Sequence, residues 1–354
     1  MRNSGEMSEL KSQRILITGG AGFIGSNLAH RLLSEGHTVT IFDNLSRAGC
    51  ECNLAWLQAM HGPKAFQQVR ASLSEFDLLQ RATEGVDRIY HLAGQVAVTT
   101  SVQNPRQDFE SNALGTFNVL EAARLVGNDP ILIYASTNKV YGGMEEVTVH
   151  EEATRYAYAT LPCGIPETQP LDFHSPYGCS KGAGDQYMRD YARIYKLRSV
   201  VVRQSCIYGY RQFGIEDQGW VAWFIIAALK QRPISIYGNG KQVRDVLFVD
   251  DLLDAYAAIV HHIDQAAGQV YNIGGGPANT MSVWLEFGHH LEKMLKRPIP
   301  VKYGDWRPGD QPIYVSDIRK AAGELGWRPR VGVQEGTERL FAWIRDNQTL
   351  FAHL

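Results

Sequence analysis

The stretch TGGAGFIGSN, residues 18–27, constrains the fold more than any other part of the sequence. It follows the apolar run RILIT (14–18) and opens a segment from about Ser26 to Glu35 that we expect to be helical. Gly19 permits a tight turn, Gly22 lets the backbone approach a pyrophosphate, and Gly25 permits close packing of helix on strand. A glycine-rich turn alone is a weak signal, but this position between a strand and a helix predicts a dinucleotide site.

An acidic residue closes the next apolar run, TVTIFD (38–43), and predicts which dinucleotide binds. The Asp43 carboxylate would accept hydrogen bonds from a ribose 2′-hydroxyl and repel a 2′-phosphate, which favours NAD over NADP. Arg47 is the counter-argument, because a guanidinium favours a phosphate, and we interpret it as a residue at the protein surface.

Short apolar runs alternate with amphipathic segments through the first two hundred residues. Further runs fall within 65–73 and at 88–94, 130–136 and 198–205. This alternation predicts an α/β fold, a doubly wound parallel Rossmann sheet. After about Tyr208 the rhythm gives way to loops rich in Gly, Arg and Asp, which indicates a smaller, interleaved α/β substrate-binding domain. We expect the NAD-binding domain to span 14–203 plus about 246–270, the substrate-binding domain to span about 204–245 plus 271–345, and residues 1–13 to form a flexible lead-in.

Composition excludes several classes of protein. Thirty-five basic against 37 acidic residues give a net charge of -2, which argues against a nucleic-acid partner. Five cysteines without paired C-x-x-C spacing indicate reduced thiols and no metal, although a site at Cys50 and Cys52 is a lesser alternative. The most apolar helical stretch, 220–229, is too short to span a bilayer, and the N-terminus lacks the apolar core of a signal peptide. We therefore expect a cytoplasmic protein with no membrane partner.

The motif SPYGCSK (175–181) places Tyr177 and Lys181 four residues apart, on one face of a helix expected to begin near Pro176. A phenol titrates near ~10, and a neighbouring ammonium together with a positive nicotinamide ring would lower that value. Thr137, at the end of the preceding strand, would hydrogen-bond the substrate oxygen. The three residues suit the removal of a proton while hydride leaves to NAD. An incidental Tyr–Lys pair is the alternative.

From Arg14 to about Trp343 the chain resembles the extended short-chain dehydrogenase/reductase family, which remodels nucleotide sugars. The resemblance rests on HLAGQ (91–95), NALGT (112–116), VYG (140–142), YGCSK, GNGKQVRDVLFVDD (238–251) and RPGD (307–310). It implies that Asn112 supports the active-site backbone and that a ribose and diphosphate are gripped by Arg244, Arg307 and Asp310. Ser72 departs from the family, which usually places an acidic residue there for the adenine. The expected cofactor contacts are Gly19, Gly22, Phe23, Ile24, Gly25, Asp43, Asn44, Ser46, Arg47, Ser72, Leu73, Leu92, Ala93, Gly94, Gln95, Asn112, Tyr177 and Lys181.

The heptad STNKVYG (136–142) discriminates among reactions. The family's 4,6-dehydratases place Asp and Glu after the threonine, whereas this chain has Asn138 and Lys139. An amide cannot deliver a proton as a general acid, so the heptad predicts no elimination of water and favours an epimerase over a simple dehydrogenase. Asn138 could instead cap the strand end, Lys139 could be solvated, and His174 could contact the sugar or be a packed histidine. The expected substrate contacts are Gln95, Thr137, Asn138, Lys139, His174, Gln242, Arg244, Arg307 and Asp310.

Segments that face the substrate resemble the 2-epimerases of CDP-linked dideoxyhexoses (the CDP-tyvelose/CDP-paratose type), among them LAGQVAVTTSVQNPRQDFE and YGYRQFGIEDQGWVAWF. This resemblance implies inversion at C2 of a CDP-sugar, CDP-glucose included, with bound NAD serving both half-reactions. A UDP-sugar 4-epimerase is the alternative, and a non-catalytic NAD-binding regulator a lesser one. Family members pair through two helices, here expected near 108–125 and 178–195, so the resemblance also implies a homodimer or homotetramer.

Overall fold

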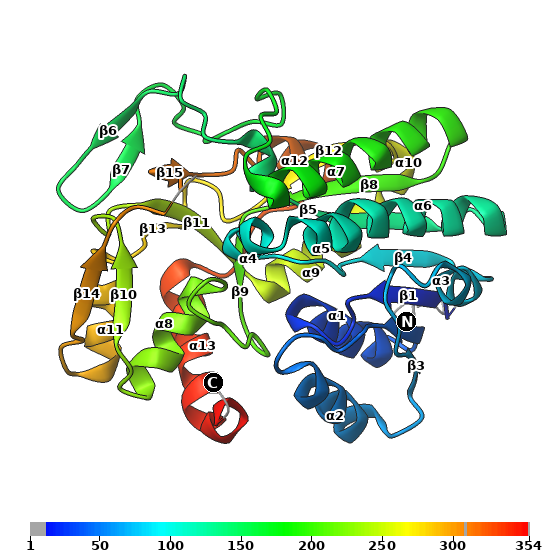
Figure 1. Cartoon of the computed structure of the whole chain (residues 1–354), viewed down its shortest axis with the longest axis horizontal. Helices are drawn as coiled ribbons and strands as arrows, with labels where there is room; N and C mark the ends of the chain where they lie inside the picture. The colour runs from blue at the N-terminus through cyan, green and yellow to red at the C-terminus, as the bar shows by residue number, and fades with distance from the viewer. Residues whose placement is uncertain (1–11, 308–309, 353–354) are drawn as a thin grey trace, which may run out of the picture.

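Seven parallel strands form the central sheet of the computed structural model, which describes residues 12–307 and 310–352 (Figure 1). The strand order is β12-β8-β5-β4-β1-β2-β3, so successive strands are added on one side of β1 as far as β3 and on its other side from β4 onwards. The predicted doubly wound parallel sheet is therefore confirmed. The strands are β1 (Arg14–Thr18), β2 (Thr38–Phe42), β3 (Phe66–Val69), β4 (Arg88–His91), β5 (Ile131–Thr137), β8 (Ser199–Gln204) and β12 (Val270–Ile273).

Helices cover both faces of this sheet, because each central strand is apolar on both sides. In β1, Ile15 and Ile17 belong to an apolar cluster with α1 (Phe23–Ser34), α2 (Cys50–His61) and α9 (Val249–His261). Leu16, between them, points to the opposite face and joins α3 (Phe76–Thr83), α6 (Gly115–Val126) and α7 (Ser175–Tyr195). This alternation buries the two halves of the core on either side of a single sheet.

A second group of elements carries its own apolar cluster. β11 (Val243–Phe248) pairs with β9 (Cys206–Tyr208), β13 (Thr280–Ser282) and β15 (Ile313–Tyr314), and β10 (Ile234–Tyr237) pairs with β14 (Val301–Gly304). Against them pack α8 (Trp220–Leu229), α11 (Phe287–Leu295) and α13 (Val333–Asp346). The remaining elements are α4 (Val98–Gln103), α5 (Pro105–Phe109), a π-helix (Glu110–Leu114), a 3₁₀ turn (Asn138–Tyr141), β6 (Val149–Glu151), β7 (Tyr156–Tyr158), α10 (Ile263–Ala266), α12 (Arg319–Leu325) and a 3₁₀ turn (Gln348–Phe351).

The segments alternate between the two groups of elements, as an interleaved organisation requires. The chain leaves the central sheet after β8 and returns through α9 to β12, whose end at Ile273 lies beyond the expected cut near residue 270. The division into two domains stays a prediction, and residues 1–11 of the expected lead-in lie outside the described residues. The helix after the glycine-rich turn begins at Phe23, three residues before the expected start, because Gly22 is its N-cap.

Candidate active site

The glycine-rich turn leaves no room for side chains at Gly19 and Gly25, because the backbone packs closely around both. Gly19 has a φ of +72°, and a Cβ placed on it would lie 2.7 Å from the backbone nitrogen of Ala93. A Cβ on Gly25 would lie 2.2 Å from the carbonyl oxygen of Gly19. Only glycine fits at either position, and the result is a helix that starts directly against the sheet. The free N–H groups and positive dipole end of α1 therefore face the carboxyl ends of β1 and β4.

A cavity of about 530 Å³ opens at this switch point, where an open α/β sheet binds its ligands. It collects residues from the ends of β1, β2, β4 and β5 and from the start of α7. Of the expected cofactor contacts, every one except Asn112 lines it. The lining set is Gly19, Gly22, Phe23, Ile24, Gly25, Asp43, Asn44, Ser46, Arg47, Ser72, Leu73, Leu92, Ala93, Gly94, Gln95, Tyr177 and Lys181.

The cavity wall offers hydrogen-bond acceptors that suit the hydroxyls and amine of a dinucleotide. Asp43 is held by the backbone N–H groups of Ala21 (3.0 Å) and Leu45 (2.8 Å), and burial raises the pKa of its carboxyl. The side-chain oxygens of Asn53 and Gln212 are buried without a hydrogen-bond partner in the described part of the chain. Buried acceptors normally have a hydrogen-bond donor, and a bound ligand could supply it here. The residues present therefore fit a dinucleotide.

A segment between β9 and α8 covers part of the cavity. It contributes residues 211–215, 218 and 219 to the lining. The Arg211 guanidinium lies 4.2 Å from the ring centre of Trp56 on α2 and 5.5 Å from that of Trp343 on α13. Arg47 donates a hydrogen bond to Gln218 of the same segment. This cover was not among the predicted cofactor contacts, although the sequence GYRQFGIEDQG marks it as an unusual loop.

Tyr177 and Lys181 line this cavity, and Thr137 lies next to Tyr177. Against the effect of burial, the Thr137 side chain lowers the pKa of the Tyr177 phenol, and α7 begins at Ser175, so Tyr177 and Lys181 share its first turns as expected. Burial raises the pKa of Tyr177 to about 12, while burial lowers the pKa of Lys181 to about 7. Without a ligand both side chains are held towards their neutral forms. A positive charge in the cavity would favour the tyrosinate that proton removal needs.

Asn112 lies behind the cavity, in the π-helix between α5 and α6, and its side chain bonds the backbone of Gln95. Its Oδ1 accepts from the Gln95 backbone N–H (2.9 Å), and its Nδ2 donates to the Gln95 carbonyl (3.0 Å). The same amide donates to Asp108 (3.1 Å), which also accepts from Ser180 (2.5 Å). Asp108 raises the pKa of Lys181 against the effect of burial. Sequence reasoning missed this buried carboxylate, because nothing local distinguishes it from a helical surface residue.

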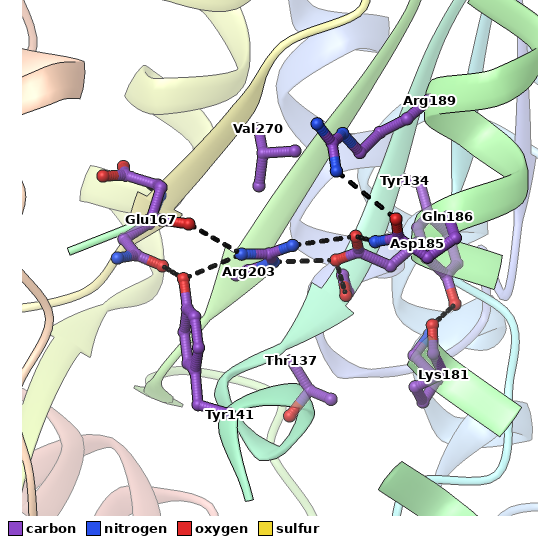
Figure 2. A network of polar contacts seen from close by, with 12 residues as sticks. Tyr134, Thr137, Tyr141, Glu167, Lys181, Asp185, Gln186, Arg189, Arg203 and Val270 are labelled. Atoms are coloured by element: carbon purple, nitrogen blue, oxygen red, sulfur yellow. Dashed lines mark hydrogen bonds and ion pairs between the residues drawn. The ribbon is translucent and has the colours of Figure 1, made fainter. Parts of the chain in front are cut away.

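A second buried network links the elements that carry Thr137 and Lys181 (Figure 2). Arg203 on β8 forms a two-pronged ion pair with Asp185 on α7, one turn after Lys181. Asp185 also accepts from Ser136 (2.9 Å), the residue before Thr137, and Arg203 donates to the Tyr141 hydroxyl (3.0 Å). The network therefore ties the end of β5, the 3₁₀ turn after it and α7 into one unit.

The expected substrate contacts divide into separate groups. Gln95 lines the cavity, and Thr137 lies beside Tyr177. Arg244 pairs with Asp310 (2.6 Å), and Arg307 pairs with Asp217 (2.9 Å) and lies 3.9 Å from the ring centre of Tyr237. The His174 side chain is 42% exposed, and its ring contacts the Asp172 carboxylate. Gln242 is buried, and its Oε1 has no hydrogen-bond partner in the described residues. Asn138 accepts from Thr137 (3.3 Å), and Lys139 lies near Arg244. Their roles stay predictions.

The described residues contain neither a candidate metal site nor a helix suited to cross a membrane. No group of three or more His, Cys, Asp or Glu side chains in residues 12–307 and 310–352 is placed to hold a metal ion. In the same ranges, no helix combines the length and apolar character needed to cross a bilayer.

Comparison with known proteins identifies the family. Residues 16–340 match the family model described as GDP-mannose 4,6 dehydratase. The chain is 44% identical to the CDP-paratose 2-epimerase of Salmonella typhi (93% of this chain, 98% of that one) and 33% identical to the UDP-glucose 4-epimerase of Mycolicibacterium smegmatis (94% and 99%). Its fold matches the NAD-bound dTDP-glucose 4,6-dehydratase of Streptomyces venezuelae with a TM-score of 0.82 at 29% identity, covering 96% and 99%. The chain thus belongs to the GDP-mannose 4,6-dehydratase family, the nucleotide-sugar epimerases and dehydratases of the extended short-chain dehydrogenase/reductases, as its sequence predicted.

Proposed function

We propose that the protein is an NAD-dependent nucleotide-sugar epimerase that inverts C2 of a CDP-linked hexose of the CDP-paratose/CDP-tyvelose type. The observation that carries this proposal is the placement of Tyr177 and Lys181 in the cavity wall with Thr137 beside Tyr177, together with Asn138 and Lys139 directly after Thr137 in the sequence. The first three residues supply proton transfer to and from a hydroxyl. The next two carry no carboxyl group, so the site lacks the acid and base that the departure of water needs.

The reaction follows from what each side chain can do. Tyr177 takes the proton of the C2 hydroxyl, Thr137 orients that oxygen, and Lys181 stabilises the tyrosinate when it is charged. Bound NAD would accept the hydride from C2 and return it. As the C–H and O–H bonds break, C2 becomes a carbonyl carbon, and the keto sugar then presents its other face. The proton returns from Tyr177 to the oxygen, so no external oxidant or reductant is consumed.

The CDP-sugar substrate is supported by the relative that is 44% identical over nearly its whole length. The UDP-sugar 4-epimerases are the second candidate, because relatives at 32% and 33% identity carry that name. Separate incubations with CDP-paratose, CDP-glucose and UDP-glucose distinguish the two. We expect inversion at C2 of a CDP-sugar. Conversion of UDP-glucose alone, at C4, would replace this proposal with the second candidate.

The mechanism has its own test. In deuterated water, internal return of the hydride leaves the inverted carbon without deuterium, whereas deuterium at that carbon would indicate deprotonation instead. Tyr177→Phe is expected to lower turnover by about 10²–10⁴-fold while NAD stays bound. Unchanged turnover in this variant would remove Tyr177 as the base.

We also propose that two copies pair through α6 and α7. These helices expose large apolar side chains on one face, and the rings of Phe117 and Tyr187 lie 5.8 Å apart across the two helices. Exposed apolar surface that is continuous over two helices is typical of an interface. The exposed side chains are Phe117 and Leu125 of α6 and Tyr187, Ile194 and Tyr195 of α7, together with Phe109 of α5 and Leu114 of the π-helix directly before α6. Sedimentation should give a dimer or tetramer, and Tyr187→Glu should shift it towards monomer. A monomeric wild-type protein would contradict the pairing.

A further inference from the structure

The Lys139 ammonium belongs to the second residue after Thr137, the proposed catalytic threonine, and in the described residues it forms no ion pair with a carboxylate. The Lys139 backbone N–H donates to the Thr137 hydroxyl (3.2 Å), which fixes the place of Lys139 in the 3₁₀ turn. The side chain is half-buried, yet across residues 12–307 and 310–352 its ammonium makes no hydrogen bond or ion pair. A half-buried ammonium without a partner is costly, so this position indicates an anion that arrives with the substrate.

The charges around Lys139 also favour an anionic ligand. The groups that act electrostatically on its ammonium are Arg244 of β11, Asp310 and Cys206 of β9. The one carboxylate among them is already engaged, because Asp310 accepts from Arg244 at 2.6 Å. Burial and the Arg244 charge lower the pKa of Lys139 to about 8. Two cations therefore face one carboxylate, and the excess positive charge suits a phosphate oxygen.

The proposed substrate carries such a group next to the reacting carbon. Its diphosphate is attached to C1, which is bonded directly to C2 but lies across the sugar ring from C4. When C2 faces Thr137, the phosphate that bears the sugar comes nearer to Thr137 than it would if C4 faced it. A cation two residues after Thr137 can then reach that phosphate while the threonine bonds the C2 oxygen.

We propose that Lys139 is a specificity-determining residue, whose ammonium binds the sugar-bearing phosphate together with Arg244 and so places C2, rather than C4, beside Thr137 and Tyr177. This assignment rests on the proposed function. The place of Lys139 in the sequence argues only against the acid and base of a dehydratase. The proposal assigns it a role in substrate binding.

Calorimetric titration with CDP and CMP tests the contact, since the two ligands differ only in the phosphate concerned. We expect Lys139→Met to weaken CDP at least tenfold and CMP less than threefold, and Lys139→Arg to restore CDP. Lys64→Met, an exposed lysine, serves as the matched control and should change neither. Equal losses for CDP and CMP, or no loss for either, would overturn the contact. Thermal unfolding and bound NAD check that each variant is folded.

Product analysis tests the consequence for regiochemistry. With CDP-glucose, the wild type should invert C2, and Lys139→Met should raise the ratio of C4-inverted to C2-inverted product. An unchanged ratio would overturn the assignment of regiochemistry to Lys139. If the wild type binds UDP and UMP but neither CDP nor CMP, the proposed function fails, and the contact is then measured with the UDP and UMP pair.

Discussion

Arg203 and Asp185 form a fully buried, two-pronged ion pair, with Nε–Oδ2 at 2.9 Å and Nη2–Oδ1 at 3.0 Å. Ser136 donates a hydrogen bond to Asp185, and Arg203 donates one to the Tyr141 hydroxyl (Figure 2). The geometry of the ion pair therefore fixes how β5 meets α7. Removing one partner strands the other charge in the core. We expect Arg203→Met to lower the free energy of unfolding by about 3–5 kcal/mol, measured by urea denaturation.

A matched double variant separates charge from shape. Arg203→Met combined with Asp185→Leu removes both charges and should recover a large part of the lost stability. If the double variant is as unstable as the sum of the two single variants, the pair stabilises the fold through packing and not through its charges.

Lys181 should give the cofactor-free protein a distinctive dependence on pH. Burial lowers its pKa to about 7, whereas the unfolded chain keeps this ammonium to about pH 10.4. Between these values the unfolded state binds the additional proton, so the free energy of unfolding rises with pH. The wild type should therefore gain roughly 2–4 kcal/mol relative to Lys181→Met between pH 7 and pH 9.5. Chemical denaturation at several pH values measures this gain, Lys64→Met should follow the wild type, and parallel curves for wild type and Lys181→Met would refute it.

Arg211 should control how long the cofactor stays bound. Its guanidinium lies between Trp56 and Trp343, so it holds the covering segment against α2 and α13. Loss of a cation–π contact costs about 0.5–2 kcal/mol, which corresponds to roughly a 2- to 30-fold faster release of NAD from Arg211→Leu. Stopped-flow displacement of NAD measures the rate. Arg232→Leu, at an exposed arginine, is the control, and identical rates in all three proteins would show that the segment does not retain NAD.

Asp43 should set the preference between dinucleotides. The carboxylate is buried at the end of β2 and oriented by two backbone N–H groups, so it presents negative charge to a ribose. Asp43→Asn is expected to weaken NAD by about 10–100-fold and to narrow the gap between NAD and NADP, because the amide no longer repels a 2′-phosphate. Equilibrium titration of both dinucleotides measures this change, with exposed Asp77→Asn as control. A wider gap would contradict the role.

Local chemistry explains which parts of the site were predictable. The glycine turn, Asp43 and the Tyr177–Lys181 spacing were readable because each acts through its own backbone or within one helix turn. Asp108, Arg203 and Arg211 were not, because their partners lie 72 residues from Asp108 (Ser180), 18 from Arg203 (Asp185) and more than a hundred from Arg211 (Trp56 and Trp343). The early helix start at Phe23 was missed because Gly22 had been assigned only a role in ligand approach. The π-helix around Asn112 has no spacing that distinguishes it from an α-helix.

The place of β12 in the sheet bears on how the chain is made. This edge strand pairs with β8 although 65 residues, including all of β9 to α10, separate the two. An N-terminal fragment that stops before residue 270 therefore leaves β8 with one edge unpaired, even though it holds every residue of the glycine turn and the catalytic helix. During synthesis, the central sheet stays incomplete until β12 emerges, and by then β9 to α10 have already left the ribosome. The two halves are then more readily understood as one cooperative folding unit than as modules that assemble in turn.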